Sequence, residues 1–458
     1  MIERLKQDAA ALKAAGDLAG AARVHQAIVR GNPQSAVAEH NLAAALGDAG
    51  DHAGAVEATT RAFQKGGSAP ETWLVRARSL QALGDVDGAE AAYEVAIARR
   101  PDFAVAHRDL AQLRWMRTAD AAAAMRALDA APNTLELALV RGTVLGSIGQ
   151  DAKARAVIET ALEQAPTMVP LRLAAAAQAG RAGDAEAQLA HATAALRAAP
   201  ASIEAARVAV EALLHTGQVG EAAQLAERIV GAAPDDQAAL ALLETAWRLT
   251  GDPRHAALAE DPALISTAML DTPEGWRDRA SFLSDLAGAL HDLHGWRSHP
   301  LGQSVQHGSQ TPIDLATVQT PVIRALFATL PTLIDAHIAR LGHGTDPVRR
   351  RMAAGWRFAG AWSIRLSAGG FHTDHVHPQG WLSSAFYVAL PAVVAREPEG
   401  WLAFGRPGIK TRPALQPFRR VQPQPGMLAL FPSYLWHGTE PFTGDAPRLT
   451  VAFDIVPT

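Results

Sequence analysis

Three of the chain's 17 histidines lie within six residues, in the segment FHTDHVHPQGW. Imidazole is the commonest metal-binding side chain in proteins, and it binds in its neutral form. Side chains two residues apart on a strand point to the same face, so His375 and His377 could bind one ion. The same spacing holds for His372 and Asp374, and a further histidine, His437, begins a later segment. These residues predict a metal site, and their spacing leaves both pairs open.

Short β-prone segments surround these histidines, and glycine or proline separates the segments from one another. From Trp356 onward the segments are WRFAGAWSIRL, WLSSAFYVAL, WLAFG, MLALFP and RLTVAFDIV. Several short strands with turn signals and no intervening helix are typical of an all-β barrel or double sheet. Two helical patterns, 276–293 and 321–341, precede the strands, and the polar segment 299–314 between them predicts a loop.

The order of these segments resembles the iron(II)- and 2-oxoglutarate-dependent oxygenases, specifically the prolyl-hydroxylase-like group, over residues 270–458. The resemblance implies a double-stranded β-helix, a jelly-roll or cupin-like fold, with flanking helices. It implies Fe(II) as the metal, 2-oxoglutarate and O₂ as cosubstrates, and His375, His377 and His437 as the metal ligands. In that family a carboxylate usually stands where this chain has His377, so the implied ligands are three imidazoles.

The resemblance also assigns residues to the cosubstrate. Arg448 corresponds to the arginine that binds the far carboxylate of 2-oxoglutarate, and Tyr387 to a tyrosine that contacts 2-oxoglutarate. Asp374 and His372 would restore a carboxylate ligand, but they are shifted three residues away from Tyr387 and its strand. We therefore expect the pair that begins at His375 to bind the ion. Asp374 and His372 are then alternative ligands or neighbours that orient an imidazole. No catalytic residue is expected beyond the metal site.

A glycine recurs every 34 residues through the first half of the chain, apart from one step of 65 residues. The positions are Gly16, Gly50, Gly84, Gly149, Gly183, Gly217 and Gly251. Glycine permits a tight turn between two helices, and the small residues that follow most of these glycines let paired helices approach closely. The pattern resembles the tetratricopeptide repeat. That resemblance implies an α-solenoid of helical hairpins with a protein or peptide partner in its groove.

The repeat stops after residue 252, which divides the chain into two predicted domains. Residues 1–262 are expected to form the α-solenoid and residues 263–458 the oxygenase-like domain. The second domain has a helical lead-in at 263–350 and a β-helix core at 351–458. The predicted fold class is therefore multidomain α plus β.

The composition excludes several kinds of chemistry and partner. The chain has no cysteine, so disulfides, thiolate zinc sites, iron–sulfur clusters and thiol nucleophiles are ruled out. A formal net charge of −4 argues against nucleic acid or an anionic membrane as a partner. The charged N-terminal segment and the lack of about 18 uninterrupted apolar residues predict a cytoplasmic protein without a membrane span. The sequence predicts no oligomeric state.

The sequence therefore predicts an Fe(II)- and 2-oxoglutarate-dependent hydroxylase that acts on a protein or peptide recruited by the repeats. Two alternatives remain open. One is a three-histidine dioxygenase that does not use 2-oxoglutarate. The other is an inactive scaffold whose repeats bind a partner.

Overall fold

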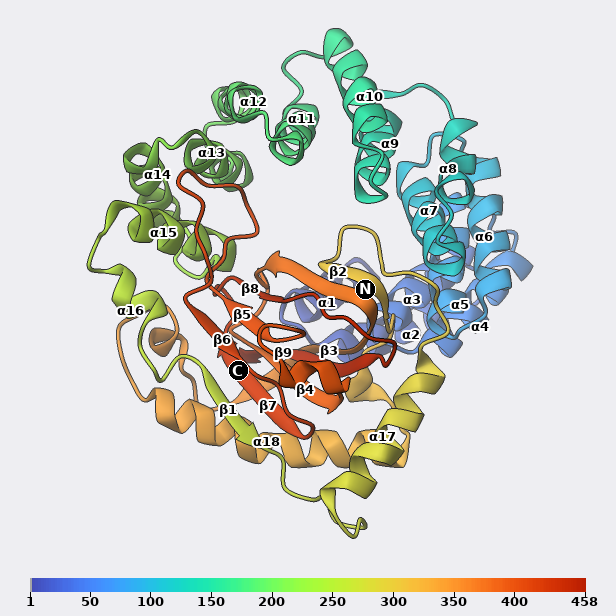
Figure 1. Ribbon diagram of the computed structural model, residues 1–458. Helices are drawn as coiled ribbons and strands as arrows, with labels where there is room; N and C mark the ends of the chain where they lie inside the picture. The colour runs from blue at the N-terminus through green and yellow to red at the C-terminus, as the bar shows by residue number, and fades with distance from the viewer. Residues whose placement is uncertain (1) are drawn as a thin grey trace. The chain divides into compact units, whose positions relative to one another are not determined.

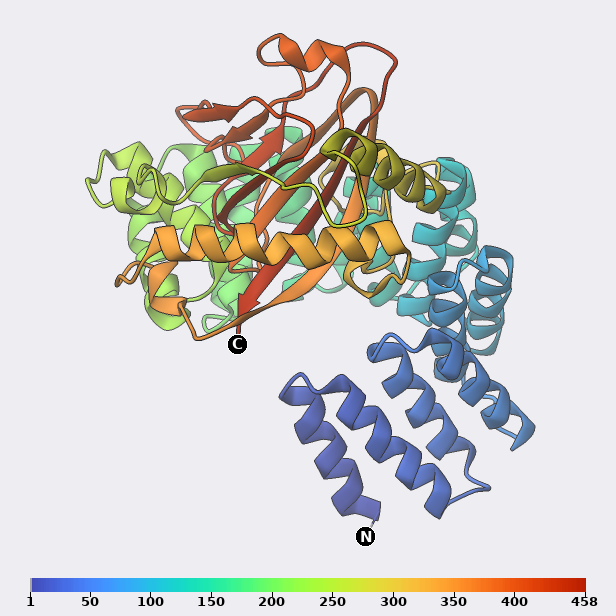
Figure 2. The ribbon, with the colours of Figure 1, turned by 90° about the horizontal axis from the view of Figure 1, so that it is seen from below.

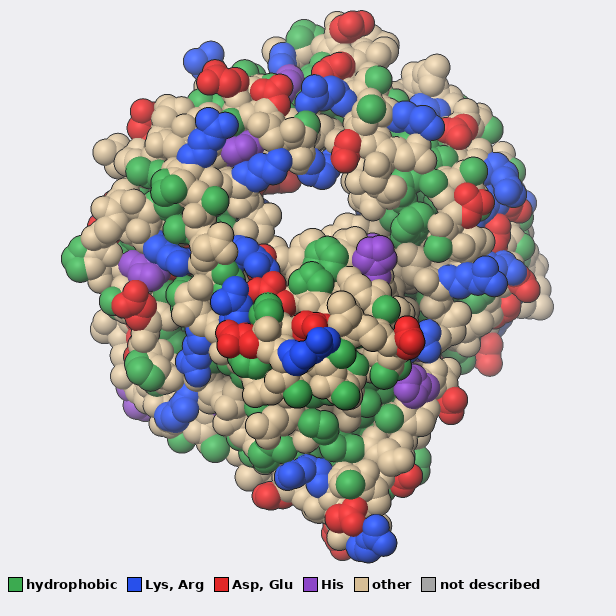
Figure 3. Space-filling view, viewed as in Figure 1, with side chains coloured by type: hydrophobic (Ala, Val, Ile, Leu, Met, Phe, Trp, Pro, Cys, Tyr) green, Lys and Arg blue, Asp and Glu red, His purple; other side chains and the backbone are tan. Residues whose placement is uncertain are grey.

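The computed structural model describes residues 2–458, which divide into two compact units with the boundary between Val144 and Leu145. Both units contain helical hairpins, and the second also contains the whole β-sheet (Figure 1). The predicted domain boundary between residues 262 and 263 lies inside the second unit and remains a prediction. On the face that Figure 3 shows, basic and acidic side chains are intermixed, in keeping with the small net charge.

Antiparallel helices follow one another through the first half of the chain, as the glycine spacing predicts. They are α1 (Ile2–Ala14), α2 (Leu18–Gly31), α3 (Ala36–Asp48), α4 (His52–Gln64), α5 (Pro70–Ala82), α6 (Val86–Arg99), α7 (Ala104–Thr118), α8 (Ala121–Asp129), α9 (Leu135–Ser147), α10 (Asp151–Gln164), α11 (Val169–Ala182), α12 (Ala185–Ala198), α13 (Ile203–Thr216), α14 (Val219–Ala232), α15 (Gln237–Thr250) and α16 (His255–Ala259). The seven periodic glycines all have φ between +69° and +83°. This left-handed conformation favours glycine, and it lets each hairpin turn within a few residues.

The 65-residue step in the glycine series marks a hairpin that turns without glycine. Helix α7 ends at Ala119, whose φ of +57° is also left-handed. An alanine in this conformation costs about 1–2 kcal/mol relative to the right-handed one. The periodic turn is therefore kept where its preferred residue is missing, and the following helix α8 is only 9 residues long.

The remaining elements of the second unit form an antiparallel sheet with flanking helices. They are β1 (Ser266–Met269), α17 (Arg279–Leu293), β2 (Val305–Gln310), η1 (Leu315–Thr317), α18 (Pro321–Leu341), η2 (Arg349–Arg351), β3 (Trp356–His375), β4 (Leu382–Ala389), η3 (Ala392–Ala395), β5 (Leu402–Phe404), β6 (Arg419–Val421), β7 (Met427–Pro432), β8 (His437–Thr439) and β9 (Arg448–Pro457). The strand order is β1-β7-β4-β9-β3-β8-β5-β6, with β2 paired to β3. This sheet and the helical hairpins confirm the predicted α plus β class.

The predicted loop at 299–314 is wrong in part, because it contains strand β2. This strand pairs with β3, and the register shifts between Gln306 and Gly308. His307, between them, has φ +51°. Such a bulge interrupts the two-residue alternation by which a strand is recognised in a sequence. The polar composition and the bulge together explain why the segment resembles a loop.

Helix α18 runs along one side of the sheet (Figure 2). By length and composition alone it is apolar enough to cross a membrane. One side of it, including Ile323, Leu326 and Leu330, is buried in the same hydrophobic core as the sheet. The helix therefore also has the packing of a core helix.

The last repeat helices share this core with the sheet. Leu240 and Leu243 of α15 belong to one buried cluster with Leu435 and Trp436, which precede β8. The indole Nε1 of Trp436 donates a hydrogen bond to Thr245 Oγ1 at 2.9 Å. Helix α15 therefore supports the strand that carries His437.

The loop 405–418, between β5 and β6, contacts three of the repeat helices (Figure 1). Lys410 Nζ donates to the carbonyl of Arg181 at 3.0 Å, and the backbone N–H of Arg412 donates to the carbonyl of Leu214 at 3.0 Å. Arg248 of α15 donates to two carbonyl oxygens of the loop at 2.6 and 2.8 Å. The loop is thus fixed to α11, α13 and α15 through backbone groups.

Candidate functional site

The pairing of β3 with β8 brings together histidines that are far apart in the sequence. In this register His375 lies directly opposite His437. Residues opposite each other on antiparallel strands point to the same face, with their side chains about 5 Å apart. His377 follows β3 by two residues, and its backbone N–H donates to the carbonyl of Ser433, which precedes β8. Sheet pairing therefore positions all three imidazoles.

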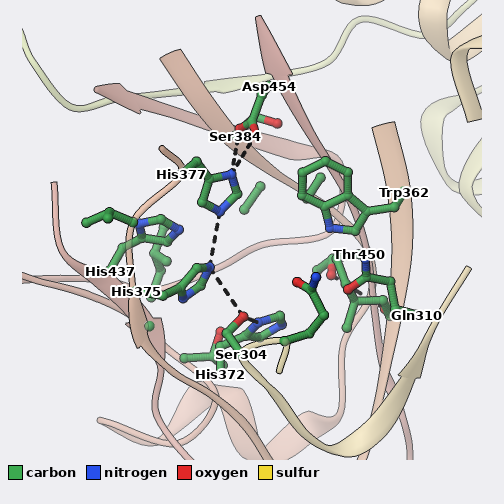
Figure 4. Close-up of a pocket in the computed structure, with 18 of the residues that line it drawn as sticks. Ser304, Gln310, Trp362, His372, His375, His377, Ser384, His437, Thr450 and Asp454 are labelled. Carbon is green, nitrogen blue, oxygen red and sulfur yellow. Dashed lines mark hydrogen bonds and ion pairs between the residues drawn. The ribbon is translucent and has the colours of Figure 1, made fainter. Parts of the chain in front are cut away.

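One ring nitrogen from each of these three histidines lies within 4.8 Å of the other two. The Nε2 atoms of His375 and His377 are 3.1 Å apart, and the rings of His375 and His437 have centroids 4.3 Å apart. Figure 4 shows the three rings gathered on one side of the cavity. The structure thus brings together the three residues that the family resemblance implies as ligands.

In each of the three imidazoles, Nδ1 lies within hydrogen-bond distance of an oxygen atom. Nδ1 of His375 lies 2.8 Å from the carbonyl of Thr373, and Nδ1 of His437 lies 2.9 Å from the carbonyl of Leu435. Nδ1 of His377 lies 2.7 and 2.8 Å from the two carboxylate oxygens of Asp454. Since carbonyl and carboxylate oxygens only accept, the hydrogen-bond network places the proton of each ring on Nδ1. Each Nε2 then carries the lone pair of its ring, and that of His375 also lies 3.3 Å from the hydroxyl of Ser304.

Burial lowers the pKa of two of these imidazoles, those of His375 and His437. Desolvation, followed by the neighbouring His377, lowers the pKa of His375 to about 3. Desolvation and the adjacent imidazoles also hold the pKa of His437 well below its usual range. A neutral imidazole is the form that binds a metal. His375 and His437 are therefore in the form that could bind a cation at neutral pH.

The nitrogen geometry fits a divalent metal ion. Two nitrogens that bind one ion at about 2.1 Å and at right angles are about 3.0 Å apart, close to the 3.1 Å between His375 and His377. Two facing lone pairs repel unless a cation lies between them. Three ligands on one side of an octahedral ion leave three positions for other ligands. The residues present therefore fit a divalent metal ion that keeps positions open for other ligands.

The alternative pair of sequence candidates points elsewhere. The Asp374 carboxylate accepts from Arg406 Nε at 2.5 Å and, within residues 2–458, makes no hydrogen bond to an imidazole. His372 lines the cavity, where its Nδ1 lies 3.1 Å from the hydroxyl of Ser304. The same hydroxyl is 3.3 Å from Nε2 of His375. His372 is thus a wall residue beside the three imidazoles.

Arg448 supplies an unpaired buried cation to the same cavity. It is 2% exposed, and its Nε donates to the carbonyl of Gly400 at 3.3 Å. In the described chain no acidic side chain forms an ion pair with it. A buried guanidinium without a counter-ion is costly, so an anionic ligand would be stabilised here.

Tyr387 lies against Arg448 and does not line the cavity itself. The guanidinium carbon of Arg448 is 5.1 Å from the centre of the Tyr387 ring. The hydroxyl of Tyr387 is buried without a hydrogen-bond partner among residues 2–458, and burial raises its pKa to about 12. The hydroxyl therefore remains protonated and available as a donor beside Arg448.

The cavity has a volume of about 260 Å³ and joins the imidazoles to Arg448. The indole of Trp362 stacks near His377, with ring centroids 5.7 Å apart. Other side chains drawn around it in Figure 4 are Ser304, Gln310, His372, Ser384, Thr450 and Asp454. The cavity therefore places the three imidazoles, the buried guanidinium of Arg448 and several polar side chains around one space.

Asp454 is the site residue that the sequence analysis missed. It lies on β9 at a two-residue spacing from Arg448, Thr450 and Ala452, and all four line the cavity. Side chains at this spacing share one face of a strand. The signal that could have identified Asp454 is therefore a lone carboxylate in the apolar segment RLTVAFDIV, in phase with Arg448.

Two family models match parts of the chain. Residues 360–454 match the model described as "Putative 2OG-Fe(II) oxygenase", and residues 70–113 match a tetratricopeptide repeat model. The first match includes the three clustered histidines, Arg448 and Asp454. No curated protein matches the chain in sequence.

Solved structures similar to parts of the chain are of the same two kinds. A tetratricopeptide repeat protein from Parabacteroides merdae is 16% identical, with 55% of this chain and 99% of that chain covered and a TM-score of 0.38. A viral collagen prolyl hydroxylase from Paramecium Bursaria Chlorella virus-1, solved with 2OG, is 11% identical. That match covers 43% of this chain and 97% of the viral chain, with a TM-score of 0.29. By the family models, one segment of this chain is similar to tetratricopeptide repeats, and the segment that holds the site is similar to 2OG-Fe(II) oxygenases.

Proposed function

We propose that this protein is an Fe(II)- and 2-oxoglutarate-dependent dioxygenase of the hydroxylase type. One observation carries the proposal. Three clustered imidazoles, one buried and two partly buried, bring ring nitrogens within 4.8 Å of one another while every Nδ1 lies within hydrogen-bond distance of an oxygen acceptor. The match of residues 360–454 to the oxygenase family supports the choice of Fe(II) and 2-oxoglutarate.

Each residue of the site has a definite task in this proposal. His375, His377 and His437 bind the ion, and their Nδ1–H hydrogen bonds keep the rings from rotating. Arg448 binds the far carboxylate of 2-oxoglutarate with its planar fork of donors, and the Tyr387 hydroxyl is available to the same carboxylate. When bound, the iron and 2-oxoglutarate supply the chemistry, in which O₂ oxidises a substrate C–H bond while 2-oxoglutarate becomes succinate and CO₂. Trp362 and the buried strand faces keep bulk water from the site.

The proposed substrate is a protein or peptide. Tetratricopeptide repeats generally mediate protein–protein interaction, and one repeat segment matches their family model. The cavity volume of about 260 Å³ supports a single side chain, rather than a bulky small molecule, as the group that enters. We propose that the protein acts in the cytoplasm.

The test is 2-oxoglutarate turnover by the full chain with Fe(II) and O₂. We expect slow succinate formation even without the true substrate, and its loss in His437→Ala. His343→Ala, which removes an exposed histidine outside the metal group, is the matched control and should retain the activity. Equal turnover in His437→Ala and wild type would overturn the proposal, as would a wild-type chain that binds no divalent metal.

A second candidate is a three-histidine dioxygenase that does not use 2-oxoglutarate, because the clustered ligands include no carboxylate. Arg448→Ala distinguishes the two. Losing one partner of a buried charge pair costs about 2–5 kcal/mol, so 2-oxoglutarate affinity should fall at least about 30-fold. Co(II) affinity should stay unchanged. Unchanged 2-oxoglutarate binding in this variant would favour the second candidate.

A further inference from the structure

Asp454 is a buried carboxylate that accepts a hydrogen bond from His377, one of the three proposed metal ligands. Its side chain is 12% exposed, and it accepts the Nδ1–H of His377 at 2.7 Å. The hydroxyl of Ser383 donates to the same carboxylate at 2.7 Å. Ser383 in turn lies 2.8 Å from the hydroxyl of Ser433, which must therefore donate to it. The hydrogen bonds therefore converge on the Asp454 carboxylate, with the two serines on one side and the imidazole of His377 on the other.

No lysine or arginine within residues 2–458 forms an ion pair with Asp454. A buried carboxylate without a cation costs several kcal/mol. Two serine hydroxyls and one imidazole N–H reduce this cost but supply no positive charge of their own. A divalent ion on the opposite nitrogen of His377 would supply it.

We propose that Asp454 is a positioning residue. Through its hydrogen bond to His377, it supplies the negative charge that a carboxylate ligand would otherwise place on the metal itself. This inference rests on the metal site of the proposed function. In the usual ligand set, one carboxylate binds the ion directly, so the ion and its ligands carry a net charge of about +1. Here a divalent ion, three neutral imidazoles and the Asp454 carboxylate would also have a net charge of about +1. The negative charge would lie on the Nδ1 side of His377 instead of on the metal. The hydrogen bond also fixes the His377 ring and makes its Nε2 a stronger donor to the metal.

The first experiment compares metal affinity in the full chain, with Co(II) as a probe that does not oxidise readily. Asp454→Asn keeps the shape and an acceptor for His377 but removes the charge. We expect Co(II) affinity to fall about 10–100-fold. The matched control is Asp445→Asn, which removes an exposed carboxylate from the loop before β9 and should leave affinity unchanged. Affinity within twofold of wild type in Asp454→Asn would overturn the inference.

The second experiment moves the carboxylate instead of deleting it. His377→Asp restores the usual ligand set but places two carboxylates in one buried pocket, where they repel. Adding Asp454→Asn to this variant should therefore raise Co(II) affinity, although the same change lowers it in the wild-type background. A merely structural Asp454 would weaken binding in both backgrounds and lower thermal stability in each.

The outcomes distinguish this inference from the proposed function. If the wild-type chain binds no Co(II) or Fe(II), the metal site itself is wrong. If the wild type binds the metal and Asp454→Asn shows no loss, or the sign does not reverse in His377→Asp, only the role of Asp454 is wrong.

Discussion

The chemistry of this site depends on what each histidine does with the nitrogen that faces away from the cavity. Thr373, Leu435 and Asp454 each accept one Nδ1–H, so the rings cannot turn or exchange tautomers without losing a hydrogen bond. Burial then keeps the imidazoles of His375 and His437 uncharged, as their lowered pKa values indicate. In the proposed function, these fixed outer contacts prearrange the three side chains to bind one cation.

At the residue scale, we predict that Asp374 is dispensable for metal binding. Asp374→Asn should leave Co(II) affinity within about twofold, because its carboxylate binds Arg406 at 2.5 Å. The melting temperature should fall, since a hydrogen bond to a charged group contributes about 1.5–3 kcal/mol. A Co(II) titration and a thermal melt check both effects, with His375→Ala as the variant that does lose the metal. A tenfold loss of affinity in Asp374→Asn would reinstate the His372 and Asp374 pair.

At the element scale, the approach of β8 to β3 requires a glycine beside the ligand His437. A Cβ at Gly438 would lie 2.6 Å from Asp374 Oδ1 and 2.9 Å from the carbonyl of His372. The backbone of β3 beside it cannot move away without disturbing its pairing with β2, where His372 lies opposite Val305. Any larger residue at 438 must therefore push β8, and with it His437, out of place.

We predict that Gly438→Ala weakens the metal site without altering a ligand. Overpacking of this kind costs about 1–3 kcal/mol, and Co(II) affinity should fall along with the melting temperature. Gly220→Ala, in α14, is the matched control because a Cβ there meets nothing within 4 Å. A Gly438→Ala protein that melts and binds Co(II) like the wild type would show that β8 tolerates the displacement.

His294 joins the end of α17 to two strands. Its Nδ1 lies 2.8 Å from Ser309 Oγ on β2, and its Nε2 lies 3.0 Å from Ser363 Oγ on β3. Ser363 donates its own hydrogen to the carbonyl of Thr450, so Nε2–H donates to Ser363 and Nδ1 accepts from Ser309. Burial, and secondarily the charge of Arg365, lower the pKa of His294 to about 4. The neutral ring therefore satisfies both serines.

This lowered pKa predicts a pH dependence of stability. The unfolded chain binds the proton with a pKa of about 6.5, so the contribution of His294 is complete above that pH. It is lost as the pH falls from about 6.5 toward 4, with a slope of up to about 1.4 kcal/mol per pH unit. His294→Asn should reduce this slope in denaturant unfolding. It should not abolish it, because burial also lowers the pKa of His337 to about 4. An unchanged slope would contradict the assignment.

At the scale of the whole molecule, the second unit has one continuous core that runs from repeat helices to the sheet. Leu240 and Leu243 of α15 are buried in the same cluster as Tyr434, Leu435 and Trp436. The hydroxyl of Tyr434 donates to the carbonyl of Leu258 at 2.8 Å, which adds a polar contact to the apolar ones. The hydrophobic core therefore continues past the end of the sequence repeat.

We predict that a fragment of residues 145–458 folds and binds Co(II), whereas a fragment of residues 263–458 does not. The shorter fragment exposes Tyr434 and Trp436, and it leaves the loop 405–418 without its hydrogen bonds to α11, α13 and α15. Circular dichroism melts and Co(II) titration of both fragments provide the measurement. A cooperative transition and full Co(II) binding in the shorter fragment would instead support the domain boundary placed at 262/263.

The sequence by itself determined the features that depend on neighbours along the chain. The 34-residue glycine spacing predicts the hairpins because a tight helical turn needs a left-handed residue, and the seven glycines have that conformation. The five predicted segments after residue 356 correspond to β3, β4, β5, β7 and β9, since composition and turn residues define a strand locally. The histidine cluster and Arg448 were visible as candidates for the same reason.

Only the tertiary structure decided which candidates meet. The choice between the His375 and His372 pairs depends on the β3–β8 register, which joins residues about sixty positions apart. Asp454 reaches His377 only because β9 pairs with both β3 and β4. Strand β2 and the shared core of α15 and the sheet depend equally on distant contacts. Local sequence patterns determine the backbone conformation of a segment, whereas strand pairing determines which distant side chains lie next to one another. A metal site needs several such side chains at one place, so the sequence alone does not define it.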